Sequence, residues 1–124
     1  MVKPIEHGAP ILVIQAKWLR KILDGDKTLE IRGTPCKKKV GIRVYLSASG
    51  SGTVCGSVTF VECVGPMDAT VWSESVAQHR SDQASMPYAT TYGWRFANPI
   101  EIEPVPYVVK KGSIVWRKFC AVGA

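Results

Sequence analysis

The most regular pattern of apolar and polar positions in this chain lies in residues 16–24. Apolar side chains recur there at helical spacing, with lysine, arginine and aspartate on the opposite face; the apolar positions are Ala16, Leu19, Ile22 and Leu23. We therefore predict a helix over residues 16–24. Gly25 is placed to end this helix in the left-handed conformation, and Trp18 lies at the edge of the apolar face.

The segment after this helix has the period of a strand. In residues 28–32, Leu29 and Ile31 point to one face, whereas Thr28, Glu30 and Arg32 point to the other. The first pair is expected to be buried.

Further strands are predicted from short apolar runs and from runs rich in β-branched residues, over residues 11–14, 40–47, 53–64, 100–109 and 113–119. Gly56 is a candidate bulge, and Pro104 and Pro106 restrict residues 100–109 to an edge or an irregular strand. Lys111-Gly112 is expected to form the turn into the last strand. A short helix is predicted over residues 73–80 with Ser73 as its N-cap, followed by a polar loop to Thr91.

These elements predict an α+β fold, in which a small β-barrel of five or six strands is flanked by two or three short helices. We expect one domain over residues 11–119, after an irregular lead-in (1–10) and before a C-terminal tail (120–124). The residues expected in its core are Leu19, Ile22, Leu23, Leu29, Ile31, Val44 and Val58.

Charge is unevenly distributed along the chain. The sequence has 16 Lys and Arg against 10 Asp and Glu, a formal net charge of +6. The residues up to Arg43 carry the whole excess, because basic and acidic residues balance from Val44 onward. Such clustering favours a polyanionic partner, since binding phosphates releases counterions. A soluble protein with a solvated basic face explains the same composition equally well.

The remaining composition predicts no metal site and no cofactor. Cys36, Cys55, Cys63 and Cys120 lack metal-ligand spacing, and we expect reduced thiols. No apolar run is long enough to span a bilayer, and the first residues lack the features of a secretory signal. We expect a cytoplasmic monomer that does not bind a membrane.

One short motif carries more information than the composition. GDKTLEIR (25–32) contains the pattern G-x-K-x-x-E-x-R at Gly25, Lys27, Glu30 and Arg32, directly after the predicted helix that carries Trp18. Further matching features are the strand end LSAS (46–49) and, within residues 92–119, Trp94, Asn98-Pro99, Pro104, Pro106, Lys111-Gly112 and Trp116. Together these features resemble the ASCH family over roughly residues 11–119. The resemblance implies a PUA-like β-barrel, a fold shared with RNA-binding and modified-base-binding domains.

The resemblance leaves catalysis open. Bacterial 4-acetylcytidine amidohydrolases share this fold and use a Lys, a Thr and a Glu. Their Lys corresponds to Lys27, but their Thr corresponds to Glu30, and their Glu would lie around Asp82 or Gln83. Some ASCH proteins have also been regarded as ribonucleases.

The candidate ligand-binding residues are Trp18, Lys27, Thr28, Glu30, Arg32, Ser47 and Ser49. Lys27 would offer a point charge to a phosphate, and Glu30 would accept a hydrogen bond from the exocyclic amine of a base. Arg32 would bind a phosphate or a ring acceptor, and a base stacked on Trp18 would gain ~1–3 kcal/mol. The alternatives are a solvated turn lysine, an exposed Glu30–Arg32 ion pair worth ~0–1 kcal/mol and a tryptophan packed in the core.

A second set of basic residues is predicted to contact nucleic-acid phosphates: Lys17, Lys21, Lys37, Lys38, Lys39 and Arg43. A solvated loop explains the lysine triplet equally well. The sequence thus predicts a domain that binds RNA, another single-stranded nucleic acid or a modified nucleoside in a basic cleft at the mouth of the barrel. One alternative is a small hydrolase of modified nucleosides or RNA that uses Lys27, with Glu30 as general base. Another is an interaction module whose basic face binds an acidic protein.

Overall fold

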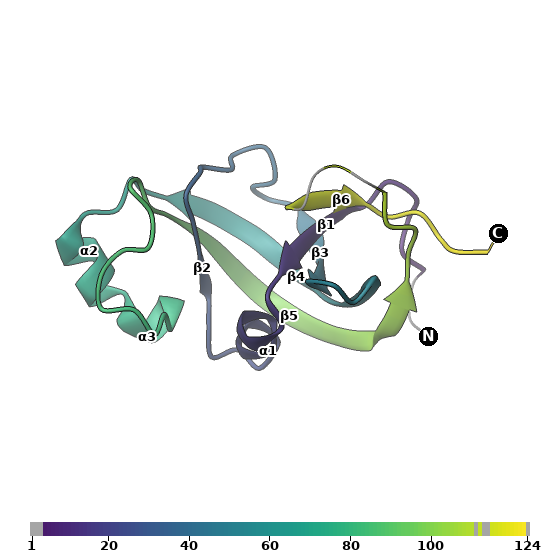
Figure 1. The fold of residues 1–124 in the computed structure, drawn as a ribbon, viewed down its shortest axis with the longest axis horizontal. Helices are drawn as coiled ribbons and strands as arrows, with labels where there is room; N and C mark the ends of the chain where they lie inside the picture. The colour runs from purple at the N-terminus through teal and green to yellow at the C-terminus, as the bar shows by residue number, and fades with distance from the viewer. Residues whose placement is uncertain (1–3, 111, 113–114, 124) are drawn as a thin grey trace.

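A computed structural model describes residues 4–110, 112 and 115–123. Nine elements follow one another along the chain (Figure 1), namely β1 (Pro10–Ile14), α1 (Ala16–Leu23), β2 (Leu29–Arg32), β3 (Arg43–Ala48), β4 (Thr53–Val64), α2 (Ala69–Glu74), α3 (Val76–His79), β5 (Tyr92–Pro106) and β6 (Trp116–Lys118). Lys111 and Ser113 of the predicted final turn and strand lie outside the described residues. No helix in the described part of the chain is long and apolar enough to cross a membrane.

All six strands belong to one mixed sheet in the order β2-β5-β4-β3-β1-β6. The β1–β3 pair is parallel and the other pairs are antiparallel. The long strands β4 and β5 curl across the whole molecule (Figure 1), and the end strands β2 and β6 are not paired with each other. The sheet is therefore a curled half-barrel, which confirms the predicted α+β class.

The main core fills the concave side of this sheet and is covered by α1. Leu19 and Ile22 of α1 pack with buried residues of four strands, including Val44, Val58 and Phe60. Outside the core, the Arg20 guanidinium donates to both carboxylate oxygens of Glu101 at 2.8 Å, which fastens the outer face of α1 to β5. The helix that carries Trp18 is thus held on both sides.

Several element boundaries differ from the prediction. Residues 40–42 form a turn before β3, which leaves Ile42 exposed. The predicted helix 73–80 is replaced by α2 and α3, and the N-cap is Asp68, whose carboxylate accepts from the Val71 N–H at 2.8 Å. Ser73 lies inside α2 instead.

The proline-rich strand begins earlier than expected, at Tyr92, and lies inside the sheet between β2 and β4. β2 pairs only with residues 92–95 of β5, so the rest of β5 has a single neighbour, β4. The prolines lie in this second part of the strand, which is locally an edge of the sheet. The restriction expected from Pro104 and Pro106 is therefore met locally.

The burial of side chains along residues 28–32 differs from the prediction. Leu29 is buried, but Ile31 is half-buried, and Glu30 on the opposite face is only 5% exposed. The reason is that α2 and α3 cover one face of β2, where Leu29 packs with Met67 and Trp72, while the other face borders the interior of the half-barrel. Glu30 and Arg32 do not form the exposed ion pair considered above.

Gly56 lies at the predicted bulge, since the β4–β5 register shifts between Val54 and Gly56. A β-carbon at this position would lie 2.5 Å from a methyl group of Leu23 and 2.8 Å from the Ile100 carbonyl oxygen. Leu23 itself is half-buried against the core instead of fully buried. The bare backbone of Gly56 thus lets the end of α1 approach the sheet.

We expect Gly56→Ala to destabilise the fold by ~1–3 kcal/mol, because the added methyl group overpacks the contact between α1 and the sheet. Unfolding in urea measures this change. Val61→Ala, at an exposed position of the same strand, serves as the control and should cost much less. Equal stability of the Gly56→Ala variant and the unmodified protein would show that α1 does not pack this closely.

Candidate functional site

A cleft of roughly 450 Å³ opens where α1, the end of β1, β2 and the segment after α3 meet. Its polar and charged lining comes from three stretches of the chain that are distant in sequence. These residues are Gln15, Lys17, Lys27, Glu30, Arg32, Ser49, Ser81, Asp82 and Gln83. Trp18 and Tyr88 supply the aromatic walls.

The turn after α1 places Lys27 in this cleft. Gly25 has a φ of +84°, and the backbone N–H groups of Asp26 and Lys27 both donate to the Lys21 carbonyl oxygen. This left-handed turn folds the chain back beneath α1. The Lys27 ammonium therefore lies 4.9 Å from the centroid of the Trp18 ring.

Lys27 is an almost fully buried cation, 3% exposed. Its Nζ donates to the His79 carbonyl oxygen and lies 3.7 Å from Glu30 Oε1. Burial lowers the pKa of Lys27 below its ordinary value, and the Glu30 carboxylate opposes this shift. An amine with a lowered pKa gives up its proton more readily than an exposed lysine does.

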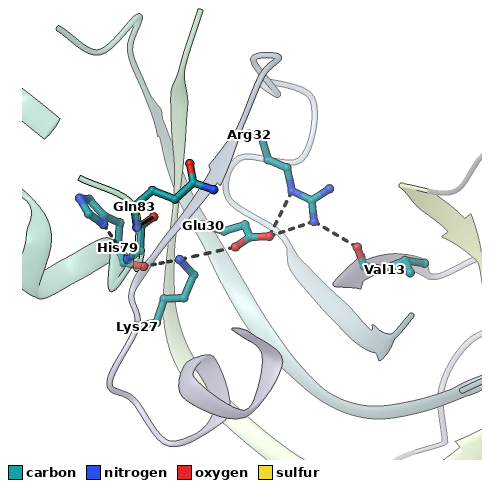
Figure 2. A network of polar contacts seen from close by, with 7 residues as sticks. Val13, Lys27, Glu30, Arg32, His79 and Gln83 are labelled. Atoms are coloured by element: carbon teal, nitrogen blue, oxygen red, sulfur yellow. Dashed lines mark hydrogen bonds and ion pairs between the residues drawn. The ribbon is translucent and has the colours of Figure 1, made fainter. Parts of the chain in front are cut away.

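Glu30 lies between Lys27 and Arg32, and the three side chains form what we call the charge array (Figure 2). Arg32 donates to Glu30 Oε2 from Nε at 3.1 Å and from Nη2 at 2.9 Å. Its Nη2 also donates to the Val13 carbonyl oxygen at 3.1 Å. Glu30 Oε1 faces the Lys27 ammonium at 3.7 Å, and within the described part of the chain Arg32 Nη1 donates no hydrogen bond, so both atoms can also serve a ligand.

The half-exposed Trp18 ring is surrounded by ammonium groups. Those of Lys17 and Lys21 lie 4.4 and 5.8 Å from its centroid, in addition to that of Lys27. Lys17 also pairs with Asp82 at 3.2 Å, which joins α1 to the segment after α3. The pair is exposed, and its hydrogen bond lowers the pKa of Asp82.

The side chain of His79 is held in place by its neighbours, and its backbone carbonyl oxygen accepts the hydrogen bond from Lys27. The ring is 1% exposed and stacks on Trp72 with centroids 3.9 Å apart. The Ser81 N–H donates to Nδ1 at 2.9 Å, so the proton must lie on Nε2, which is 3.1 Å from the Trp72 carbonyl oxygen. Burial lowers the pKa of His79, and the bond to Trp72 opposes that shift.

The structure brings six of the predicted site residues to one cleft: Lys17, Trp18, Lys27, Glu30, Arg32 and Ser49. Thr28, Ser47 and Lys21 do not line it. Ser47 is buried and shares a 3.0 Å hydrogen bond with the Tyr107 hydroxyl. Lys37, Lys38 and Lys39 line a separate groove, and Arg43 donates to Ser57, Thr59 and Asn98.

Some lining residues were missed by sequence reasoning. Tyr88 and Ser81 come from a polar loop without periodicity, and Gln15 lies in the short link between β1 and α1. The glycine at position 33 is a sequence feature that could have indicated the place of Tyr88. A β-carbon at Gly33 would lie 2.8 Å from the Tyr88 ring. Asp82 and Gln83, considered above only by analogy, both line the cleft.

Comparison with known proteins agrees with this arrangement. The model of the ASCH domain matches residues 12–106. This chain belongs to the ASCH domain family. The match includes α1, the turn and the whole charge array, so the G-x-K-x-x-E-x-R pattern of this ASCH domain supplies the charge array of the cleft. A search of curated proteins found no match.

Solved structures share the fold at low identity. A crystal structure of ASCH from Zymomonas mobilis matches with a TM-score of 0.68 and 15% identity, over 82% of this chain and 75% of the other. A serine-to-alanine mutant of that protein matches with a TM-score of 0.73 and 14% identity, over 92% and 89% of the two chains. A tyrosine-to-phenylalanine mutant gives 0.67 and 17%, over 80% and 76%.

The described residues contain no group of three or more His, Cys, Asp or Glu side chains that could hold a metal ion. All four cysteines are free thiols.

We expect the stability of this ASCH domain to fall on acidification partly through His79. Below about pH 6.5 the unfolded chain protonates this residue, while the folded chain, with its lowered pKa, does not, so folding loses at most ~1.4 kcal/mol per pH unit. His79→Gln should make the decline in unfolding free energy between pH 7 and 5 shallower. The measurement is urea unfolding across this range, and equal slopes would contradict a neutral, buried His79.

Proposed function

We propose that the cleft of this ASCH domain binds RNA or a nucleotide by holding one base and its phosphate. The observation that carries the proposal is the buried charge array, which opens into the cleft beside a half-exposed tryptophan. Buried charges cost several kcal/mol unless they are paired. Here Glu30 and Arg32 are paired, yet each keeps a polar atom for a ligand.

The array offers donors and an acceptor in a fixed order. Glu30 Oε1 can accept from the exocyclic amine of adenine or cytosine, and Arg32 Nη1 can donate to a ring acceptor or a phosphate. Lys27 uses one of its donors on His79 and keeps the others for the ligand. Because Arg32 is already docked on Glu30 and Val13, little side-chain freedom is lost on binding.

Trp18 supplies the stacking surface. Its indole borders the cleft beside Lys27, and stacking a base on it is worth ~1–3 kcal/mol. Lys17 and Lys21 lie near the same ring and provide positive charge for a phosphate next to the stacked base. Base recognition and phosphate attraction thus meet at one end of α1.

One observation favours a second candidate, a hydrolase of acylated nucleosides or of RNA. The pKa of Lys27 is lowered by burial, and the Glu30 carboxylate lies beside it. For an acylated base, water would attack the acyl carbon while this pair takes its proton. The carbon–nitrogen bond then breaks, and the proton passes to the released amine. The Thr of the known 4-acetylcytidine amidohydrolases is replaced by Glu30, which argues against their version of the reaction, and the binding function remains our proposal.

The variant Glu30→Gln separates the two functions. It exchanges a carboxylate acceptor for an amide that both donates and accepts, so a binding domain should change which bases it prefers. A hydrolase should instead lose turnover by ~10²–10⁴-fold with little change in binding. Glu62→Gln, an exposed carboxylate paired with Arg95 outside the cleft, controls for the lost charge.

The assay combines fluorescence binding of mononucleotides with mass spectrometry of acylated and alkylated nucleosides and of RNA after incubation. Binding by the unmodified protein without any product, and an altered base preference in Glu30→Gln alone, are the expected results. Turnover that is lost in Lys27→Ala and Glu30→Gln would establish the hydrolase. No binding of any nucleotide would refute the proposed function.

A further inference from the structure

A second basic site lies beyond the cleft, in the loop between β2 and β3. It is a groove of roughly 390 Å³ lined by Pro35, Cys36, Lys37, Lys38, Lys39 and Trp116, which we call the lysine–tryptophan groove. No acidic side chain lines it. Among the ion pairs between described residues, none involves its three lysines.

The loop holds these like charges together through its backbone. The Val40 N–H donates to the Lys37 carbonyl oxygen and the Ile42 N–H to that of Lys39, while Gly41 bonds to Phe60 of β4. The loop is therefore fastened to the sheet and presents three consecutive ammonium groups to one groove. Neighbouring like charges repel one another, and an anion in the groove would relieve that repulsion.

Trp116 gives the groove an aromatic wall. Its ring stacks on the buried Trp94 with centroids 5.8 Å apart and planes inclined by 17°, and the Lys39 ammonium lies 5.4 Å from its centroid. A base that stacked on Trp116 would displace this ammonium and free Lys39 for the adjoining phosphate. Aromatic rings interleaved with lysines are the surface on which single strands bind.

The groove lies near the cleft, and the buried Trp94 connects one residue of each. The Arg32 guanidinium of the charge array lies 5.3 Å from the Trp94 centroid, and Trp94 stacks on Trp116, so Arg32 and Trp116 lie within about 11 Å of each other. In Figure 1 the loop leaves the end of β2 and passes towards β6.

We propose that the lysine–tryptophan groove is a second subsite, and that the ligand of this domain is a single strand of RNA longer than one nucleotide. The inference rests on the proposed function, because it requires one nucleotide in the cleft. The strand then runs from Trp18 and the charge array, past Arg32, to Trp116 and the lysines. A duplex is excluded, since its paired and stacked bases could not splay onto the two rings.

The test compares binding of a mononucleotide and of a hexanucleotide RNA by fluorescence polarisation at several salt concentrations. We expect the hexanucleotide to bind the unmodified protein at least about tenfold more tightly, since a second stacked base contributes at least ~1 kcal/mol and each added phosphate contact adds more. In Lys37→Ala/Lys38→Ala this gain should shrink, with a salt slope shallower by about 1.4, while the mononucleotide affinity stays unchanged. Both lysines are exposed, so folding is preserved.

The matched control is Lys110→Ala/Lys118→Ala, which removes the same charge at exposed positions outside both sites and should keep the length gain. Trp116→Leu should lose affinity for the hexanucleotide and keep that for the mononucleotide. Equal affinity for both lengths, or an equal loss for both in the lysine variant, overturns the subsite and leaves the cleft function standing. Failure of the mononucleotide and the hexanucleotide alike overturns both.

Discussion

The position of one carboxylate constrains most of this structure. Glu30 is almost completely buried, and an unpaired carboxylate in such a place would cost several kcal/mol. Two cations from opposite directions compensate it: Lys27, placed by the left-handed turn at Gly25, and Arg32, two residues further along the same strand face. The G-x-K-x-x-E-x-R spacing is therefore first a condition for burying a charge. Under the proposed function, ligand recognition uses the polar atoms that this pairing leaves without a protein hydrogen bond.

The parts of the fold that depend on local sequence could be predicted, and those that depend on distant segments could not. The helix, its glycine stop and the bulge at Gly56 follow from neighbouring residues and were confirmed. The burial of Glu30 was missed because alternation along β2 assigns one face to solvent. The segment carrying α2 and α3, more than thirty residues later in the chain, covers one face, and the half-barrel encloses the other. Asp68 was missed as the N-cap because the short α2 has too little periodicity to show where it begins.

In the site too, the parts set by local sequence could be predicted and the parts set by distant segments could not. The charge array and Trp18 lie within fifteen residues of sequence, joined by one helix, one turn and one strand, so a motif could bring them together. The opposite wall, with Ser81, Asp82, Gln83 and Tyr88, comes from a loop that distant contacts hold in place. His79 stacks on Trp72, and the Tyr88 ring packs close to the backbone of Gly33. Basic residues close in sequence also separate in space. Arg43 turns onto the sheet, where it donates to Ser57, while Lys37 to Lys39 line their groove.

The distribution of charge around the cleft separates specificity from attraction. Three cationic and two anionic side chains line the cleft itself, so it is nearly balanced despite the +6 charge of the chain. Lys21 and the lysines of the lysine–tryptophan groove lie outside the cleft, and among the ion pairs between described residues none involves them. Phosphate contacts position a nucleic acid without reading its sequence, whereas paired donors and acceptors discriminate between bases. Under the proposed function, the nearly balanced charge array would read the base and the lysines outside it would attract the phosphates, so the two tasks would fall to different residues.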